Sequence, residues 1–357
     1  MTESPSRGKM SSSSSWSSPT VAVKTTATRD SSSPLPSSKR VRGLDNAEVV
    51  PEDEVISPLL VTSSTSSSPA TRSSARRKDP NTAVRTLSDL IRINKNVVFL
   101  TGAGLSCASG IPPFRGSRDA IWTKSVYEWG TKERFLKDPL EWYREFFLRH
   151  FTVVYSAQPN AAHVALSRIC AKFPATCRVI TQNVDMLHTH PAAPIPAGQL
   201  IEVHGRVDHF KCFTEGCPFS TKESVVLTTP ITSEQDVPRC PNCGAICCPN
   251  TLLFDEHYSD HALYQFDKAL EWLVTADVIV FVGTSFQVGI TNFAFEAVLA
   301  HEQGVATGVS ERFLFNFNIS DNVPRLSKGI KTPVHSVKGL CELTLPLLAE
   351  YLEDKTT

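Results

Sequence analysis

Two pairs of cysteines have the spacing of a metal site. Cys212 and Cys217 enclose four residues, Cys240 and Cys243 enclose two, and 22 residues separate the pairs. Paired turns of this kind bring four thiolates together around a tetrahedral zinc ion. Four thiolates leave no position open for catalysis, so the sequence predicts a structural zinc site. Reduced thiols in a loop and a zinc ribbon that binds nucleic acid are the alternatives. The segment 208–250 is not strongly basic, which speaks against the ribbon.

Cys247 and Cys248 lie just after the second pair and compete with it as metal ligands. Two adjacent residues are badly placed to share one metal ion, which favours Cys240 and Cys243. Ten cysteines in 357 residues are too few for a disulfide scaffold. A metal site in a reducing compartment is therefore the better interpretation.

A glycine-rich turn, Gly102-Ala103-Gly104-Leu105-Ser106, follows the apolar run 97–100. In a doubly wound α/β fold this is where the pyrophosphate of a dinucleotide binds, because glycines let backbone N–H groups approach the phosphates. The full dinucleotide fingerprint is absent, since the next glycine, Gly110, comes too late. A tight turn without a ligand is the alternative. The loop that follows carries two prolines, Phe114 and Arg115, and is predicted either to cover a ligand or to be a surface loop.

Three polar side chains, Gln182, Asn183 and Asp185, follow the apolar run 178–181. At the carboxyl end of a parallel strand such groups point into the crevice where ligands bind. Recognition of a ribose or a nicotinamide is favoured, and capping of the next helix is the alternative.

Two further strand ends supply polar groups for the same crevice. His204 and Gly205 follow the run 200–203, and a histidine there is a candidate general base. A surface or core histidine without a chemical role is the alternative. Gly283-Thr284-Ser285 ends the run 278–282 and offers another phosphate or ribose contact.

The elements that must position these groups alternate along the chain. Short runs that are apolar on both sides occur at 97–100, 178–181, 200–203, 278–282, 313–315 and 334–337, and segments of helical length occur at 83–93, 161–173 and 263–274. Buried strands separated by helices predict a parallel sheet covered on both faces. We therefore expect an α/β fold with a Rossmann-like doubly wound sheet.

The first 80 residues have a different composition. Serine supplies 22 of them, with 11 Lys/Arg and 8 Asp/Glu. Such a segment cannot bury enough apolar surface to offset its ordering entropy, so residues 1–80 are predicted to be a disordered tail. Its basic clusters Lys39-Arg40-Val41-Arg42 and Arg76-Arg77-Lys78 suit nuclear import. A nuclear or cytoplasmic protein is expected in preference to a mitochondrial one, because no amphipathic period supports a transit peptide.

Composition argues against several classes of protein. The chain has 36 basic and 36 acidic side chains, so bulk electrostatics would not hold it to nucleic acid or to a membrane. No apolar stretch has the length of a membrane helix, and the first 30 residues lack the apolar region of a secretory signal.

Together these features resemble the sirtuin family of NAD-dependent protein-lysine deacylases. The matching residues are Gly102-Ala103-Gly104-Leu105-Ser106, Gly110-Ile111-Pro112 with Phe114-Arg115-Gly116, Thr181-Gln182-Asn183-Val184-Asp185, His204-Gly205, the two cysteine pairs, and Gly283-Thr284-Ser285. The resemblance extends over residues 81–350. It implies a Rossmann-like core of residues 81–119, 159–207 and 251–350, a helical insertion of 120–158 and a small zinc-ribbon module of 208–250.

The resemblance also implies roles for the site residues. Gly102, Ala103, Gly104 and Ser106 would hold the phosphates of NAD, and Phe114 and Arg115 would lie over its ribose and nicotinamide. Gln182, Asn183 and Asp185 would line the nicotinamide pocket, and Gly283, Thr284, Ser285, Asn318 and Cys341 would lie on the adenosine side. His204 and Asn183 would be catalytic: after nicotinamide leaves, His204 accepts a ribose hydroxyl proton. Its pKa is expected near 7.

The substrates that this resemblance implies are acyl-lysine proteins or peptides, with histones among the candidates. Neither direct nucleic-acid binding nor membrane binding is expected. The family commonly has Asp where Pro113 stands and Phe-Gly-Glu where Phe254-Asp255-Glu256 stands, so nicotinamide binding and peptide preference are open to change. Ile121 and Lys124 replace the Tyr and Arg of members that favour dicarboxylic acyl groups, which predicts an acetyl or other uncharged acyl group. A protein mono-ADP-ribosyltransferase and a non-catalytic NAD-binding scaffold are the alternative functions.

Overall fold

The computed structural model describes residues 80–112, 124–319 and 329–353, all within one compact unit of the chain. Almost the whole of the predicted tail, 1–80, lies outside the described residues, as do Pro113, Phe114 and Arg115. Within these described ranges no helix has the length and apolar character needed to cross a membrane.

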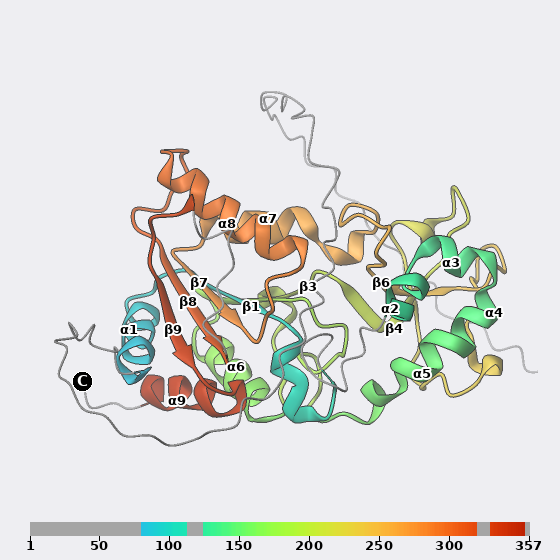
Figure 1. Ribbon diagram of the computed structural model, residues 1–357, viewed down its shortest axis with the longest axis horizontal. Helices are drawn as coiled ribbons and strands as arrows, with labels where there is room; N and C mark the ends of the chain where they lie inside the picture. The colour runs from blue at the N-terminus through green and yellow to red at the C-terminus, as the bar shows by residue number, and fades with distance from the viewer. Residues whose placement is uncertain (1–79, 113–123, 320–328, 354–357) are drawn as a thin grey trace, which may run out of the picture. The chain divides into compact units, whose positions relative to one another are not determined.

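Six parallel strands form the central sheet, in the order β3-β2-β1-β7-β8-β9 (Figure 1). Their bounds are β1 Val97–Thr101, β2 Cys177–Thr181, β3 Leu200–Glu202, β7 Val278–Val282, β8 Phe313–Asn318 and β9 Val334–Lys338. The predicted parallel sheet and all six predicted strands are confirmed, β8 being longer than its apolar run. The order is that of a Rossmann fold: β1, β2 and β3 extend the sheet to one side, and β7, β8 and β9 extend it to the other side of β1.

Helices cover both faces of this sheet, because successive strand residues point to opposite sides. On β1, Val97 and Phe99 pack against α1 (Pro80–Arg92), α6 (Ala161–Lys172) and α9 (Cys341–Glu353). Val98 and Leu100 pack on the opposite face against α7 (Phe266–Thr275) and α8 (Gly289–Glu302). Figure 1 shows the two groups of helices on either side of the strands.

The predicted helix 263–274 begins later than its apolar pattern. Residues Ala262–Tyr264 form a 3-10 turn, η7, capped by the ring of His261. Gln265 then adopts a left-handed conformation with φ of 47°, and α7 starts at Phe266. The apolar pattern runs through the turn because Tyr264 is buried as fully as the helical residues that follow it.

A second, antiparallel sheet has the order β5-β4-β6. Its strands are β4 Gly205–Lys211, β5 Val225–Val226 and β6 Cys248–Thr251. The helical segment before α6 comprises α2 Lys124–Trp129, α3 Lys132–Lys137, α4 Pro139–Trp142, the π-helix η2 Tyr143–Phe147, α5 Leu148–His150 and the 3-10 helix η3 Thr152–Ser156. Further 3-10 turns are η1 Ala103–Ser109, η4 Ala197–Gln199, η5 Pro218–Ser220 and η6 Glu234–Asp236.

The helical segment and the cysteine-bearing strands share one hydrophobic core. Trp142 and Tyr143 are fully buried there beside Cys212 and Cys240. The Tyr143 hydroxyl donates to the carbonyl of Cys247 at 2.6 Å. The helical insertion and the zinc-ribbon module therefore pack around one shared core.

Candidate functional site

The polar groups singled out in the sequence lie at the carboxyl ends of neighbouring parallel strands. Gly102 follows β1, Gln182 follows β2 and Gly283 follows β7, and β2 and β7 flank β1 on either side. His204 comes two residues after β3, which pairs with β2. The topology therefore gathers these loops at one edge of the sheet, where doubly wound folds bind ligands.

Glycines allow the loops after β1 and β7 to touch. A Cβ on Gly104 would lie 2.7 Å from the carbonyl oxygen of Gly283, and Gly283 itself has φ of 57°. The amide of Gly104 donates to that same carbonyl at 2.8 Å, and the amide of Gly102 donates to Val282 at 2.9 Å. These two N–H groups thus hold the loops together, and phosphate binding by this turn stays a prediction.

Ser106, Asn183 and Asp185 form a buried polar network. The Ser106 hydroxyl donates to Asp185 Oδ2 at 2.6 Å and accepts from Asn183 Nδ2 at 3.1 Å. Asn183 Nδ2 also donates to the carbonyl of Gly102, and the amide of Leu187 donates to Asp185 Oδ1. Burial raises the pKa of Asp185, and the bonds from Ser106 and Leu187 act against that rise. The network ties the loop after β1 to the loop after β2.

One atom of this network is left without a partner. Asn183 is 4% exposed, and its Oδ1 is buried without a hydrogen bond to the protein. Leaving a buried acceptor unsatisfied is costly unless a ligand or water supplies a donor. Asn183 Oδ1 is therefore a candidate contact for a donor group of a ligand.

Two of the remaining predicted residues, Gln182 and Asn318, bond to Thr284. Gln182 Nε2 donates to Thr284 Oγ1 at 3.3 Å, and Asn318 Nδ2 donates to the Thr284 carbonyl at 2.7 Å. Ser285 is exposed. Cys341 is buried with its thiol 3.8 Å from the carbonyl of Phe317.

His204 is held through both of its ring nitrogens. Nδ1 lies 2.9 Å from the carbonyl oxygen of Gln182, and Nε2 lies 3.1 Å from the hydroxyl of Tyr258. Burial lowers the pKa of His204 to about 4, although the bond to Gln182 acts in the opposite direction. The expected pKa near 7 is therefore not found: at neutral pH the imidazole is already uncharged and able to accept a proton.

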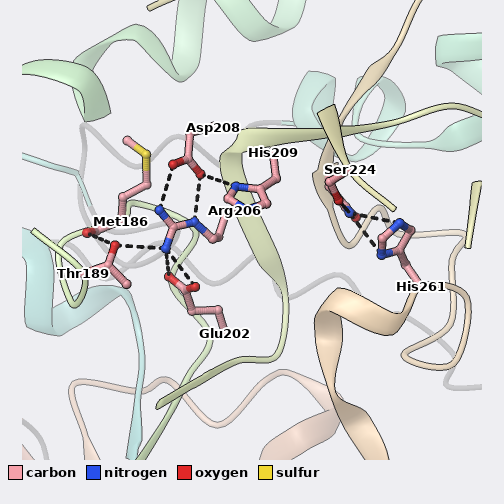
Figure 2. A network of polar contacts seen from close by, with 9 residues as sticks. Met186, Thr189, Glu202, Arg206, Asp208, His209, Ser224 and His261 are labelled. Carbon is pink, nitrogen blue, oxygen red and sulfur yellow. Dashed lines mark hydrogen bonds and ion pairs between the residues drawn. The ribbon is translucent and has the colours of Figure 1, made fainter. Parts of the chain in front are cut away.

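Arg206 bonds to carboxylates that lie before and after His204 in the sequence. Its guanidinium forms paired bonds to Asp208 at 2.7 and 2.8 Å, and bonds to both carboxylate oxygens of Glu202 (Figure 2). It also donates to the hydroxyl of Thr189, which belongs to the loop after Asp185. Burial alone would raise the pKa of Asp208, but the bonds from Arg206 and His209 hold that pKa well below its usual range. Paired bonds of this kind fix geometry as well as adding energy.

The predicted zinc ligands come together. Cys212, Cys217, Cys240 and Cys243 place all their sulfur atoms within 4.8 Å of one another. The Sγ atoms of Cys212 and Cys243 are 3.9 Å apart, and those of Cys217 and Cys240 are 3.6 Å apart. With zinc–sulfur bonds of about 2.3 Å, a tetrahedral site needs sulfur separations of this size. The four thiolates fit one zinc ion and leave it no free coordination position.

Two contributors to the site were missed from the sequence. Arg206 carries no motif signal, because an arginine on a short strand is most often a solvated side chain. Tyr258 lies two residues after Phe254-Asp255-Glu256. The departure of these three residues from the family's Phe-Gly-Glu is the only sequence signal near Tyr258. Phe114 and Arg115, which the resemblance places over the ribose and nicotinamide, lie outside the described residues.

Comparison with known proteins places these features in a family. Residues 102–289 match the model of the Sir2 family. The chain is 39% identical over 272 residues to the NAD-dependent deacetylase sir2E of Dictyostelium discoideum, covering 72% of this chain and 74% of that protein. It is 35% identical over 201 residues to an NAD-dependent protein deacylase of Pyrococcus furiosus, covering 56% of this chain and 75% of the relative.

Solved structures give the same result. A mutant Sir2 homologue in complex with ADP-ribose is 26% identical, with a TM-score of 0.58 over 75% of this chain and 95% of the other. A Sir2 homologue in complex with NAD is 25% identical, with a TM-score of 0.56 over 75% and 93%.

Proposed function

The chain belongs to the Sir2, or sirtuin, family, and from this and the geometry of the crevice we infer that it is an NAD-dependent protein-lysine deacylase. It transfers the acyl group of a lysine side chain to ADP-ribose and releases nicotinamide. The observation that carries the proposal is the position of His204. Its imidazole is joined by a 2.9 Å bond to Gln182, directly beside Asn183 and its unpartnered acceptor.

The residues in the crevice fit NAD. Asn183 Oδ1 is an unsatisfied acceptor for a sugar hydroxyl. Thr284 accepts hydrogen bonds from Gln182, which follows β2, and from Asn318 at the end of β8. When bound, NAD supplies the ribose whose anomeric carbon takes the acyl oxygen as nicotinamide leaves. We assign Ser106 and Asp185 the task of keeping Asn183 in place.

The base is His204. The carbonyl of Gln182 can only accept a hydrogen bond, so Nδ1 carries the ring hydrogen and Nε2 carries the basic lone pair. The protein therefore accepts the sugar proton at Nε2. A general base must be unprotonated before it can accept a proton, and burial keeps His204 neutral at neutral pH.

Zinc stabilises the fold and takes no part in the reaction. All four ligand positions are thiolates, whereas catalytic zinc sites keep one position for water or substrate. Three of these cysteines, Cys212, Cys217 and Cys240, also belong to the core that holds Trp142 and Tyr143.

The finer specificity is proposed on sequence grounds. The absence of a Tyr and Arg pair at Ile121 and Lys124 supports an acetyl or other uncharged acyl group. The basic clusters 39–42 and 76–78 support a nuclear location, with histones as candidate substrates. Imaging of the full chain beside a variant with both clusters neutralised tests the location. Equal cytoplasmic distribution of the two proteins would remove the proposal.

The activity is tested by incubating the protein with NAD and an acetyl-lysine peptide. Nicotinamide and O-acetyl-ADP-ribose should form in equal amounts, as measured by liquid chromatography and mass spectrometry. His204→Ala should abolish deacylation and leave NAD binding, measured by calorimetry, largely intact. Full turnover in this variant would remove His204 from the mechanism. Stable labelling of a protein by NAD, without any acyl group, would instead identify an ADP-ribosyltransferase.

A further inference from the structure

A chain of hydrogen bonds leads from helix α8 to the base. The backbone amide of Ile290 donates to the hydroxyl oxygen of Tyr258 at 3.1 Å, and that hydroxyl lies 3.1 Å from His204 Nε2. An amide N–H can only donate. Nε2 of the neutral ring, with its hydrogen on Nδ1, can only accept. The direction of every bond is therefore fixed: Ile290 donates to Tyr258, Tyr258 to His204, and His204 to Gln182.

Counting lone pairs shows what this arrangement leaves open. Nε2 has a single lone pair, and the Tyr258 hydroxyl occupies it. The phenolic oxygen has two lone pairs, of which Ile290 takes one. A hydroxyl arriving from a substrate cannot bond to Nε2 while Tyr258 stays in place. It can, however, donate to the remaining lone pair of the phenolic oxygen.

Packing holds Tyr258 in this position. Its ring is stacked on Phe266, with centroids 4.7 Å apart and planes inclined by 11°. The ring of Phe293 meets it edge to face, with centroids 6.3 Å apart. On another side a Cβ added to Gly289 would come within 3.2 Å of the tyrosine ring. Moving the hydroxyl away from His204 would break these contacts and leave both Ile290 and Nε2 without their partner.

We propose that Tyr258 is a second catalytic residue, which relays the proton of a sugar hydroxyl to His204. The inference rests on the proposed deacylase function. The sugar O–H bond breaks as its proton passes to the phenolic oxygen, and the phenolic proton passes at the same time to Nε2. Tyr258 ends neutral, His204 ends protonated, and the sugar oxygen gains the electron pair of its broken bond. No oxidant or further reactant is needed.

The test is Tyr258→Phe, which keeps the ring and its stacking. Deacylation should fall by about 10-fold or more, because an acid–base group contributes on this scale. Exchange of labelled nicotinamide into NAD should persist, since nicotinamide leaves before the base acts. Tyr351→Phe on α9 is the matched control, and it should turn over like the unmodified protein. A Tyr258→Phe kcat equal to or above that of the unmodified protein would overturn the relay, because the hydroxyl would then merely compete with substrate.

A second readout needs no ligand. In nitrogen-15 NMR of the free protein, with His204→Gln to identify the signals, the unmodified chain should show hydrogen on Nδ1. In Tyr258→Phe the Nε2 signal should shift and His204 should titrate at higher pH, because the neutral ring loses its donor. An unchanged His204 signal would remove the bond on which the relay depends. If the unmodified protein fails to deacylate any peptide, the proposed function fails, while this measurement still decides the contact.

Gly289→Ala gives an independent variant in which the hydroxyl is retained. The added methyl group presses on the tyrosine ring and should move it by a few tenths of an ångström. We expect a smaller loss of deacylation than in Tyr258→Phe and an Nε2 shift in the same direction. Unchanged values for both measurements would contradict the relay.

Discussion

The hydroxyl of Ser106 donates to the carboxylate of Asp185 at 2.6 Å, across 79 positions of sequence. The two Asp185 oxygens serve different partners, because the amide of Leu187 donates to the other one at 3.1 Å. Asp185 is thus needed as a double acceptor. Through Ser106 it also fixes the side chain of Asn183, whose free oxygen faces no protein donor.

Asp185→Asn should weaken NAD binding. The asparagine side chain has one acceptor oxygen in place of two. Either the Ser106 hydroxyl or the Leu187 amide therefore loses its acceptor and faces the NH2 group of the asparagine, which is itself a donor. Charge-assisted bonds of this kind contribute about 1.5–3 kcal/mol, so we expect Kd to rise by about 10- to 100-fold in calorimetry. Asp267→Asn replaces an exposed carboxylate on α7 and serves as the control. Unchanged affinity in Asp185→Asn would show that Asn183 keeps its position without this network.

Gly104→Ala should separate the loops after β1 and β7. The new Cβ would lie 2.7 Å from the Gly283 carbonyl, and neither backbone segment can turn aside as a flexible side chain would. We expect a loss of about 1–3 kcal/mol in the free energy of unfolding, together with weaker NAD binding. Gly198→Ala is the matched control, because a Cβ there has no atom within 4 Å. Equal urea denaturation midpoints for the two variants would contradict the close contact.

The sequence predicted the frame of the site better than its interior. Strands such as β7, buried at every residue, give a signal that depends only on local composition. The crevice at the carboxyl ends then follows from topology, and the cysteine spacing predicts the metal cluster. The contacts of His204 do not follow, because Gln182 and Tyr258 lie 22 and 54 positions away and their meeting depends on the packed loops. The low pKa of His204 could not be predicted for the same reason: burial is a tertiary property.

Cys240→Ser should release the metal. A serine hydroxyl is a poor zinc ligand, and structural zinc contributes folding energy directly. Elemental analysis should show less than one zinc per chain, and thermal unfolding should begin at a lower temperature. Cys247→Ser is the control, since Cys247 is buried nearby but lies outside the four-cysteine cluster. If Cys247→Ser lost zinc and Cys240→Ser retained it, Cys247 would be the zinc ligand in place of Cys240.

Two buried histidines should make the fold sensitive to mild acid. His163 and His188 are almost fully buried with ring centroids 5.2 Å apart, and each has a nitrogen without a partner in the protein. Burial lowers the pKa of His163 to about 4, and burial followed by the nearby His163 lowers that of His188 well below 6.5.

The sign of the effect follows from proton linkage. Both pKa values are lower in the folded protein, so as the pH falls below about 6.5 the unfolded chain binds protons first. The free energy of unfolding should therefore decrease between pH 6.5 and pH 5, by about 1–2 kcal/mol for each histidine, and recover above pH 7. Urea unfolding at pH 7, 6 and 5 measures this slope. His188→Gln should reduce it whatever its effect on stability at pH 7, because the glutamine does not titrate. An identical slope in that variant would mean that His188 is not buried in its neutral form.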